Sequence, residues 1–399
     1  MFLSKGDKNI CKKSRGVKFL MDNTKKTNRK ISIRQVMILF FFTVVSCTLR
    51  ITTVNQNNFF AKSSWLSPFF AVIPMLLLIF ILDKLIKKHQ DKSLTQIIEI
   101  VFGKIIGKII LFLFFIHVLF YISFFLKNFG EKFVSSIFPD VSPMFFIILL
   151  ILSALFAVKK NIESFARFAE FSFFIILIVF IAAFFTVLPN IEIKNLYPVT
   201  YYDVSDILKS SLPLISIWSP LTFSLFLGDN IRYSGKPGTE ENNNTTDKFK
   251  HTAVKFMIIT AIFNLLCFIA VIGIFNADTA NSMPMSYFMI FKSIKSSGII
   301  QSFETLFIFS WVFTDFIIVV YYMFIMSKIF KTLFVIDHEK TKFFMVPLAF
   351  IILILTFIIG ENNSEAEFFY TNILSFSSVV LGYIFPFLLV GVGKVRRVL

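Results

Sequence analysis

A short polar run interrupts the first apolar stretch of the chain, at a position where it could bind a small solute. A bilayer core takes roughly 20 apolar residues at ~1.5 Å each, so this run falls well inside the depth of a membrane. Polar groups at that depth are tolerated mainly where they face protein or a water-filled cavity. Hydroxyl groups suit hydrogen bonding to a ligand or an ion, and a guanidinium suits a ligand carboxylate. The residues of this run are Ser46, Cys47, Thr48 and Arg50.

Two interpretations of this run stay open. In one, the helix is broken and the break lines a solute site, with Arg50 either receiving a ligand carboxylate or pairing with Asp315. Such a pair would offset two costly desolvations, because Asp315 lies near the middle of a later apolar stretch. In the other interpretation, the helix ends near Leu49 and Arg50 extends to the outer membrane surface.

A second interruption lies in the sixth apolar stretch. Ser216, Trp218 and Ser219 are followed there by Pro220, and a proline removes one helical hydrogen bond. These serines, like the hydroxyl groups of the first run, either bind a ligand or ion or bond back to helix carbonyls. Trp218, with Tyr121 of the third apolar stretch, either walls the pocket or packs against neighbouring helices.

Charged and hydroxyl side chains at two further places suit ion binding or gating. Thr314 and Asp315 are adjacent in the eighth apolar stretch, where they could form a cation or proton site. Glu163 and Arg167 are four residues apart at the inner end of the fifth stretch. That spacing predicts an ion pair on a helix surface. We favour a structural role for this pair, with a gate latch as the alternative.

The same residues exclude several classes of function. The chain has no Walker A loop, no G-x-S-x-G and no H-E-x-x-H sequence, so we expect no enzyme. We also expect no metal and no cofactor, because the histidines are scattered and the three cysteines form no pairing pattern. These residues are His89, His117, His251, His338, Cys11, Cys47 and Cys267.

The composition predicts an all-α membrane protein. Hydrophobic residues make up 56% of the 399-residue chain, and they gather in runs long enough to cross a bilayer. We expect ten transmembrane helices: Val36–Phe60, Trp65–Leu82, Ile105–Leu126, Pro143–Val158, Phe165–Leu188, Ile207–Leu227, Thr252–Phe275, Ile299–Ser327, Phe343–Gly360 and Phe368–Val392.

The distribution of positive charge supports this count. With a cytoplasmic N-terminus, 32 Lys and Arg residues fall on the cytoplasmic side and 7 on the other, while Arg50 is the fortieth. Cytoplasmic loops carry such an excess in membrane proteins. The net charge of +16 therefore records orientation, so we expect no nucleic acid partner, and contact with anionic lipid is secondary.

The spans divide into two sets of five. We expect a basic cytoplasmic tail (1–34), a ten-helix domain (35–392, with repeats of about 35–190 and 205–392) and a cytoplasmic C-terminus (393–399). Interrupted helices at matching positions, the first and the sixth, are typical of an inverted-repeat, LeuT/APC-like transporter fold with a site near the midplane. Interfacial helices are expected at Ser93–Lys108 and Met285–Ser297.

Several sequence blocks, in this order, resemble the B-subunit permease family of endospore germinant receptors, a branch of the amino acid/polyamine/organocation superfamily. The break in the first span departs from the family pattern, since it lacks the usual Gly and following Pro, and Asn161 stands where the family prefers Gly. The matching blocks are Ile31–Gln35, Trp65–Ser67, Ser93–Leu94, Phe102–Gly107, Asn161–Glu170, Asn195–Val199, Phe303–Glu304 and Trp311.

The resemblance implies a ten-helix subunit in the spore inner membrane that senses a small germinant, such as an amino acid. It also implies two partners, a larger membrane A subunit and a C lipoprotein. Germinant binding would favour one of two gate states. The alternatives are a permease that moves an amino acid with H⁺ or Na⁺, and a scaffold that binds no solute and serves only receptor assembly.

Overall fold

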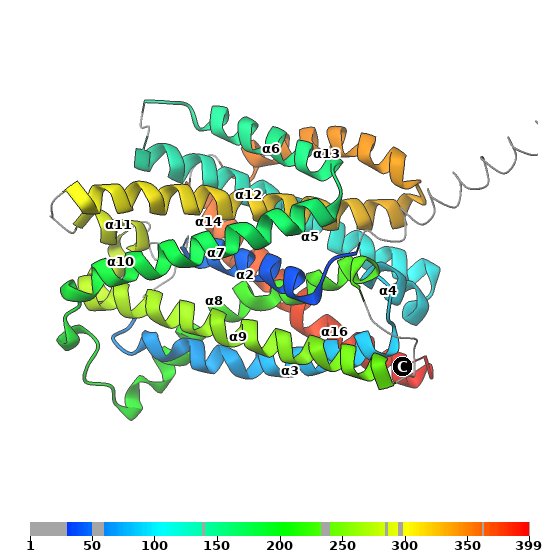
Figure 1. Ribbon diagram of the computed structural model, residues 1–399, viewed down its shortest axis with the longest axis horizontal. Coiled ribbons are helices and arrows are strands. Elements are labelled where there is room, and N and C mark those ends of the chain that lie inside the picture. Colours follow the sequence, from blue (N-terminus) through cyan, green and yellow to red (C-terminus); the bar gives the residue numbers. More distant parts are fainter. Residues whose placement is uncertain are drawn as a thin grey trace, which may run out of the picture.

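The computed structural model of the chain describes residues 30–49, 60–137, 140–232, 240–283, 286–293, 298–360 and 363–398. Within them every regular element is a helix, apart from one isolated parallel bridge between Ile31 and Ile231. The long helices run roughly side by side, with α4 and the C-terminus at one end of the bundle and α10 and α11 at the other (Figure 1).

The α-helices follow one another along the chain with short connections. They are α2 (Ile33–Leu49), α3 (Ser67–Lys88), α4 (Leu94–Phe102), α5 (Lys104–Ile137), α6 (Pro143–Lys159), α7 (Ile162–Val187), α8 (Val204–Trp218), α9 (Glu240–Phe275), α10 (Ala277–Ser282), α11 (Ser286–Ser293), α12 (Gly298–Phe334), α13 (His338–Ile358), α14 (Asn363–Phe369), α15 (Ser375–Val379) and α16 (Phe385–Val395). The 3₁₀ segments are η1 (Ser64–Leu66), η2 (Leu188–Asn190), η3 (Ile193–Asn195), η4 (Tyr201–Asp203) and η5 (Ser219–Asn230), and the π-helical segments are η6 (Tyr370–Leu374) and η7 (Val380–Ile384).

Apolar helices stand at the positions of the predicted spans, but their lengths do not establish how many of them cross the membrane. Eight helical segments of the described residues are long and apolar enough to cross a membrane. Two shorter apolar helices of 17 residues, α2 and α6, stand where the first and fourth spans were predicted. A multi-pass membrane protein is therefore established, whereas the count of ten and the division into repeats stay predictions.

Two predicted boundaries need revision. The interfacial helix expected at Ser93–Lys108 ends at Phe102, because Gly103 adopts φ 82° and the following residues belong to the long helix α5. The start of α4 carries a capping box formed by Ser93 and Gln96. The second interfacial helix corresponds to α11, and residues 285 and 294–297 of that prediction lie outside the described residues.

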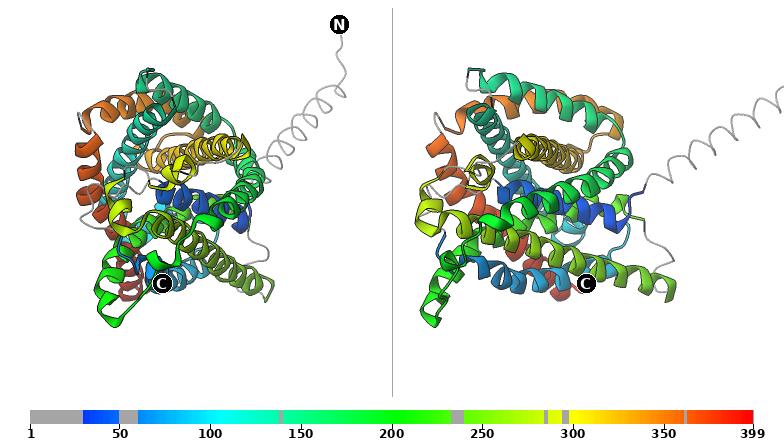
Figure 2. Two further views of the ribbon diagram at one scale, coloured as in Figure 1. Left: turned by 90° about the vertical axis from the view of Figure 1, so that its left-hand side faces the viewer. Right: turned by 60° about the vertical axis from the view of Figure 1, so that its left-hand side comes forward.

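The first helix lies at the centre of the bundle. Every residue of α2 from Val36 to Leu49 is buried, and the helix contacts α7, α8, α9, α12 and η5. Figure 2 shows α2, in dark blue, in the interior of the bundle among the other helices. A helix that is apolar on all sides is typical of such a central position, so any polar side chain on α2 must find its partner within the protein.

The sixth span changes helix type where the sequence predicts an interruption. α8 ends at Trp218, and the amide of Ser219 donates to the carbonyl of Ser216, a 3₁₀ bond. Pro220 follows and has no amide hydrogen to donate to the preceding turn. The chain goes on as η5, a 3₁₀ helix of 12 residues. The position of the interruption is confirmed, but the helix tightens there and is not unwound.

The tenth span presses closely on this junction. The Thr222 hydroxyl donates to the carbonyl of Gly382 at 2.5 Å. A Cβ atom on Gly382 would lie 2.5 Å from the Cβ of Ser219 and 2.7 Å from its carbonyl oxygen. The π-helical segment η7 therefore needs glycine at this position, because no larger residue leaves the backbones this close.

We expect Gly382→Ala to lower the unfolding free energy by about 1–3 kcal/mol, since the added methyl group has no room. The measurement is thermal unfolding of the purified protein in detergent micelles. Gly391→Ala, on the adjoining helix α16, is the matched control, because a Cβ there meets no atom within 4 Å. Equal melting temperatures for the two variants would contradict the expected crowding.

His89 directly follows α3, at the end of the bundle that is predicted to be cytoplasmic. Its side chain is buried, and its Nε2 atom has no hydrogen-bond partner among the described residues. Burial lowers the pKa of His89 below 6.5, and Lys92 and Lys88 lower it further. At neutral pH the folded protein therefore favours the neutral form of this ring.

The protein should lose stability as the pH falls below 6.5, because His89 then binds a proton in the unfolded chain but not in the folded one. Above that pH the stability associated with neutral His89 is fully present. Below it, the unfolding free energy falls with decreasing pH by at most about 1.4 kcal/mol per pH unit for this one proton. His89→Gln should flatten this part of the profile of melting temperature against pH. A variant with an unchanged acid slope would rule out His89 as the source.

Candidate functional site

The polar run of α2 is divided among three neighbouring helices. The Ser46 hydroxyl donates to the Asp315 carboxylate of α12. Cys47 and the Tyr121 hydroxyl of α5 are 3.1 Å apart, and the Thr48 hydroxyl donates to the Asn264 side chain of α9 at 2.9 Å.

This division follows from the geometry of a helix. Successive side chains of an α-helix point about 100° apart, since 3.6 residues make one turn. Three adjacent polar residues on a surrounded helix therefore meet three different partners. Arg50 lies outside the described residues, so its predicted contact with a ligand or with Asp315 stays a prediction.

The polar residues of the sixth span face the tenth span. The Ser216 hydroxyl donates to the carbonyl of Ser375, in α15, at 3.1 Å. The described contacts of Ser216 and Ser219 are thus with α15 and η7, although α2 also contacts both α8 and η5. Within the described residues α2 is a continuous α-helix through Ser46, Cys47 and Thr48 as far as Leu49, so the break predicted in the first span is not seen there. The helices of the first and sixth spans are in contact, but the serine side chains of the sixth span turn to another neighbour.

Two polar atoms at the α8–η5 junction are left without partners. Trp218 and Ser219 are fully buried. Neither the Trp218 Nε1 atom nor the Ser219 Oγ atom has a hydrogen-bond partner among the described residues. Buried polar groups are almost always paired with protein, water or ligand. Among the described residues, this junction therefore holds one donor and one hydroxyl group that are not paired.

An aromatic cluster joins the two halves of the site. The rings of Tyr121 and Tyr322 lie 4.7 Å apart, and Phe223 of η5 lies 6.0 Å from Tyr322 and 5.5 Å from His117. His117 also hydrogen-bonds Ser377 at 2.9 Å. His117 is thus a packed residue with a partner, the role expected of a lone histidine in a span. Tyr121 both contacts the site and packs against other rings.

Thr314 and Asp315 behave differently from one another. The Thr314 hydroxyl donates to the carbonyl of Trp311, in its own helix, at 2.7 Å. Its described hydrogen bond is thus within α12, and its predicted role in a cation or proton site stays a prediction. Asp315 is fully buried and accepts the Ser46 hydroxyl, so it remains the residue best suited to hold a proton or a cation. Among the described residues, no three His, Cys, Asp or Glu side chains gather as a metal site would require.

The ion pair predicted at the inner end of the fifth span is present. Arg167 and Glu163 are 2.5 Å apart, and the Arg167 side chain is 71% exposed. Such an exposed pair contributes little to stability. Two other hydrogen bonds join helices α2 and α7 at this end. The Glu170 carboxylate of α7 accepts one from Arg34 and one, at 2.8 Å, from the Gln35 side chain of α2.

Sequence reasoning missed several residues that complete this site. Glu170 and Arg34 each lie in one of the sequence blocks that resemble the family, so the resemblance offered a signal for these two residues. No such signal marked the other residues, because each is one polar or aromatic residue in a long apolar stretch. They are Asn264, Phe223 and Tyr322.

Comparisons with known proteins agree with this architecture. A family model described as "Spore germination protein" matches residues 30–365. The chain belongs to this spore germination protein family. A search of curated proteins finds no match.

Solved structures show that this family member has a transporter fold of the LeuT/APC-like type. Three mutant forms of a manganese transporter from Eremococcus coleocola are each 13% identical to it, with TM-scores of 0.53, 0.53 and 0.54. The alignments cover 82–84% of this chain and 68–69% of the transporters. The family and these neighbours are permease-like or transporter-like and not enzymes.

The bond between Ser46 and Asp315 can be tested by mutation. Ser46→Ala should lower the unfolding free energy by about 1.5–3 kcal/mol, because it removes a donor from a buried carboxylate. In a protein that already carries Asp315→Asn the same change should cost only about 0.5–1.5 kcal/mol. Melting temperatures of the two single variants and the double variant give the coupling.

Ser123→Ala is the control for this cycle, since the Ser123 hydroxyl donates, among the described residues, to the backbone carbonyls of Leu119 and Ile352. Its cost should not depend on residue 315. A Ser46→Ala effect that is the same in both backgrounds would exclude coupling between the serine and the carboxylate.

Proposed function

We propose that this chain is the membrane-embedded B subunit of a spore germinant receptor, which binds a small germinant at the α8–η5 junction and passes on the signal. The observation that carries the proposal is the pair of unpartnered polar atoms at Trp218 and Ser219. A polar group buried in a membrane protein without a partner is costly. A bound solute that accepts from the indole and bonds the hydroxyl would remove that cost.

The nature of the junction supports this location. In transporters built from repeats, the substrate site lies near the bilayer midplane, where helices are discontinuous. A 3₁₀ run longer than about four residues is uncommon and often marks a hinge, and η5 has 12 residues. The aromatic cluster of Tyr121, Phe223 and Tyr322 lies against η5 and offers an apolar wall for a small amino acid or similar molecule.

Signalling would follow from unequal affinity of the germinant for two arrangements of the bundle. η5 connects the junction to the predicted cytoplasmic end, where the Ile231 segment pairs with Ile31 just before α2. Lys328 of α12 and Asp229 of η5 form an ion pair of 2.5 Å at the same end. A germinant that shifts η5 would thereby disturb contacts with both α2 and α12.

The partners in this proposal are a larger membrane A subunit and a C lipoprotein, in the spore inner membrane. The distribution of Lys and Arg supports a cytoplasmic position for both termini of the chain. Membership of the spore germination protein family supports the assignment to a receptor rather than to general nutrient uptake.

A second candidate is an amino acid permease coupled to H⁺ or Na⁺, which the transporter-like fold and the buried Asp315 favour. Uptake of radiolabelled amino acids into proteoliposomes separates the two. Saturable accumulation by this chain alone, abolished by Asp315→Asn, would favour the permease. Binding without accumulation would favour the receptor subunit.

Ser219→Ala should weaken germinant binding roughly two- to tenfold, because it removes a hydrogen bond to the ligand. It should leave the melting temperature of the free protein unchanged or raise it, since an unpartnered buried hydroxyl is lost. A panel of proteinogenic amino acids is first screened for those that germinate wild-type spores. Spores that carry the variant should need a correspondingly higher concentration of the same amino acid. Loss of refractility measures germination, and thermal shift of the purified chain measures binding.

Ser224→Ala is the matched control, because the Ser224 hydroxyl lies in the same 3₁₀ segment and donates to the carbonyl of Leu221 at 2.6 Å. It should leave germinant sensitivity unchanged. Wild-type germination by Ser219→Ala and Trp218→Phe together would instead favour the scaffold role.

A further inference from the structure

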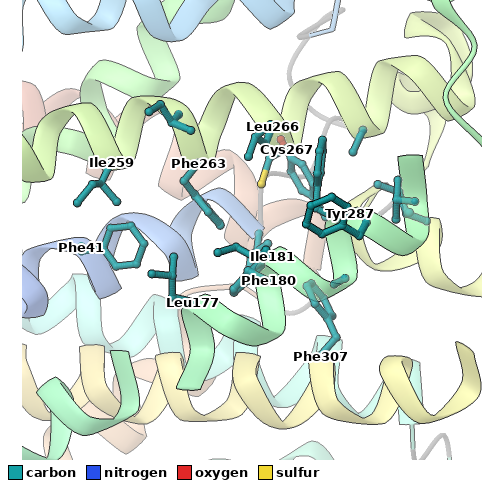
Figure 3. Close-up of a pocket in the computed structure, with 18 residues that line it drawn as sticks. Phe41, Leu177, Phe180, Ile181, Ile259, Phe263, Leu266, Cys267, Tyr287 and Phe307 are labelled. Atoms are coloured by element: carbon teal, nitrogen blue, oxygen red, sulfur yellow. The ribbon is translucent and has the colours of Figure 1, made fainter. Parts of the chain in front are cut away.

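An apolar crevice of about 450 Å³ lies away from the polar site, between α2, α7, α9, α11 and α12. Figure 3 shows its lining, with Phe41 and Ile259 toward one end, Phe263 and Cys267 along the wall, and Tyr287 toward the other end. Its size falls within the range of about 300–1,000 Å³ that is typical of ligand sites.

The crevice opens toward lipid. Three residues of its lining are strongly exposed, namely Ile181 and Phe185 of α7 and Ile262 of α9, at 50%, 66% and 50%. All three lie in helices that are long and apolar enough to span the membrane. Apolar side chains exposed on such helices face the bilayer, so the molecules nearest to this opening are lipid acyl chains.

Tyr287 supplies the crevice with one polar group that lacks a partner. Its side chain is only 3% exposed, and its hydroxyl has no hydrogen-bond partner among the described residues. Every other lining residue except Cys267 has a purely apolar side chain. A hydroxyl group left unpaired at membrane depth is costly, so an acceptor on the occupant is expected at this end.

The depth of Tyr287 identifies the acceptor. Tyr287 lies in α11, which sits with α10 at the end of the bundle opposite the C-terminus (Figure 1). Phe41, by contrast, lies halfway along α2. The long direction of the crevice thus runs from the membrane interface toward the midplane, which is the course of an acyl chain that hangs from a glycerol ester.

We propose that the crevice binds one acyl chain of a membrane phospholipid, with the Tyr287 hydroxyl donating to the ester carbonyl. The acyl chain moves from the lipid bilayer, a medium as apolar as the crevice. The affinity of the phospholipid for the crevice therefore comes from close packing and from that hydrogen bond. The occupant contacts Phe41 and Leu49 of α2 and thereby packs that helix against α7 and α9. This site is separate from the germinant site and does not rest on the proposed function.

Photolabelling tests the proposal with the full-length protein in nanodiscs. The probe is a phosphatidylcholine with a diazirine on its acyl chain, present at a low mole fraction so that labelling follows occupancy. After irradiation and proteolysis, adducts are quantified in peptides from α7 and α9 and compared with peptides from α6 and α13, which also expose apolar residues to lipid. We expect at least threefold enrichment in the crevice peptides.

Two variants and their controls sharpen the test. Tyr287→Phe should lower the enrichment two- to tenfold, whereas Tyr321→Phe should not, because it removes an equally buried, unpartnered hydroxyl outside the crevice. Ala270→Phe should fill the crevice and abolish the enrichment, whereas Ala182→Phe, on the same helix as Ala183 but outside the lining, should preserve it.

Native mass spectrometry of the detergent-purified protein gives a second measurement that does not need the bulkier variants. The wild type should retain one phospholipid that Tyr287→Phe loses at lower collision energy. Adducts spread over all lipid-facing helices in proportion to exposed area would overturn the proposal. So would equal retention of phospholipid by the wild type and Tyr287→Phe.

Discussion

The central helix α2 is surrounded by protein at a depth where no water is available, and the rest of the structure depends on how its polar groups are satisfied. Three adjacent residues carry side chains that would each be costly in an apolar interior. Each finds its partner on a different neighbour, Ser46 on α12, Cys47 on α5 and Thr48 on α9. These bonds fix both the rotation of α2 about its axis and the positions of the helices around it.

The α8–η5 junction obeys the same constraint by other means. Pro220 removes an amide hydrogen, so the helix tightens into a 3₁₀ form and its serines turn toward the tenth span. There the missing side chain of Gly382 and two π-helical segments make room for a close approach of the backbones. The Trp218 indole nitrogen and the Ser219 hydroxyl remain unpaired at this junction among the described residues.

The polar site and the apolar crevice share α2 but differ in their surroundings. The first is enclosed by protein and holds hydrogen-bonding groups, while the second opens between α7 and α9 and holds one hydroxyl group.

The amino-acid sequence by itself determined the membrane class, the positions of the spans and the place where the sixth helix is interrupted. These properties are local, since they follow from runs of apolar residues, from proline chemistry and from the spacing of Glu163 and Arg167 along one helix. It did not determine that Thr48 would meet Asn264, that Glu170 would hold Arg34 and Gln35, or that Tyr287 would close an apolar crevice. Only the tertiary structure decided those contacts, because they depend on which faces of distant helices meet, and an apolar helix shows no difference between its faces until its neighbours are in place.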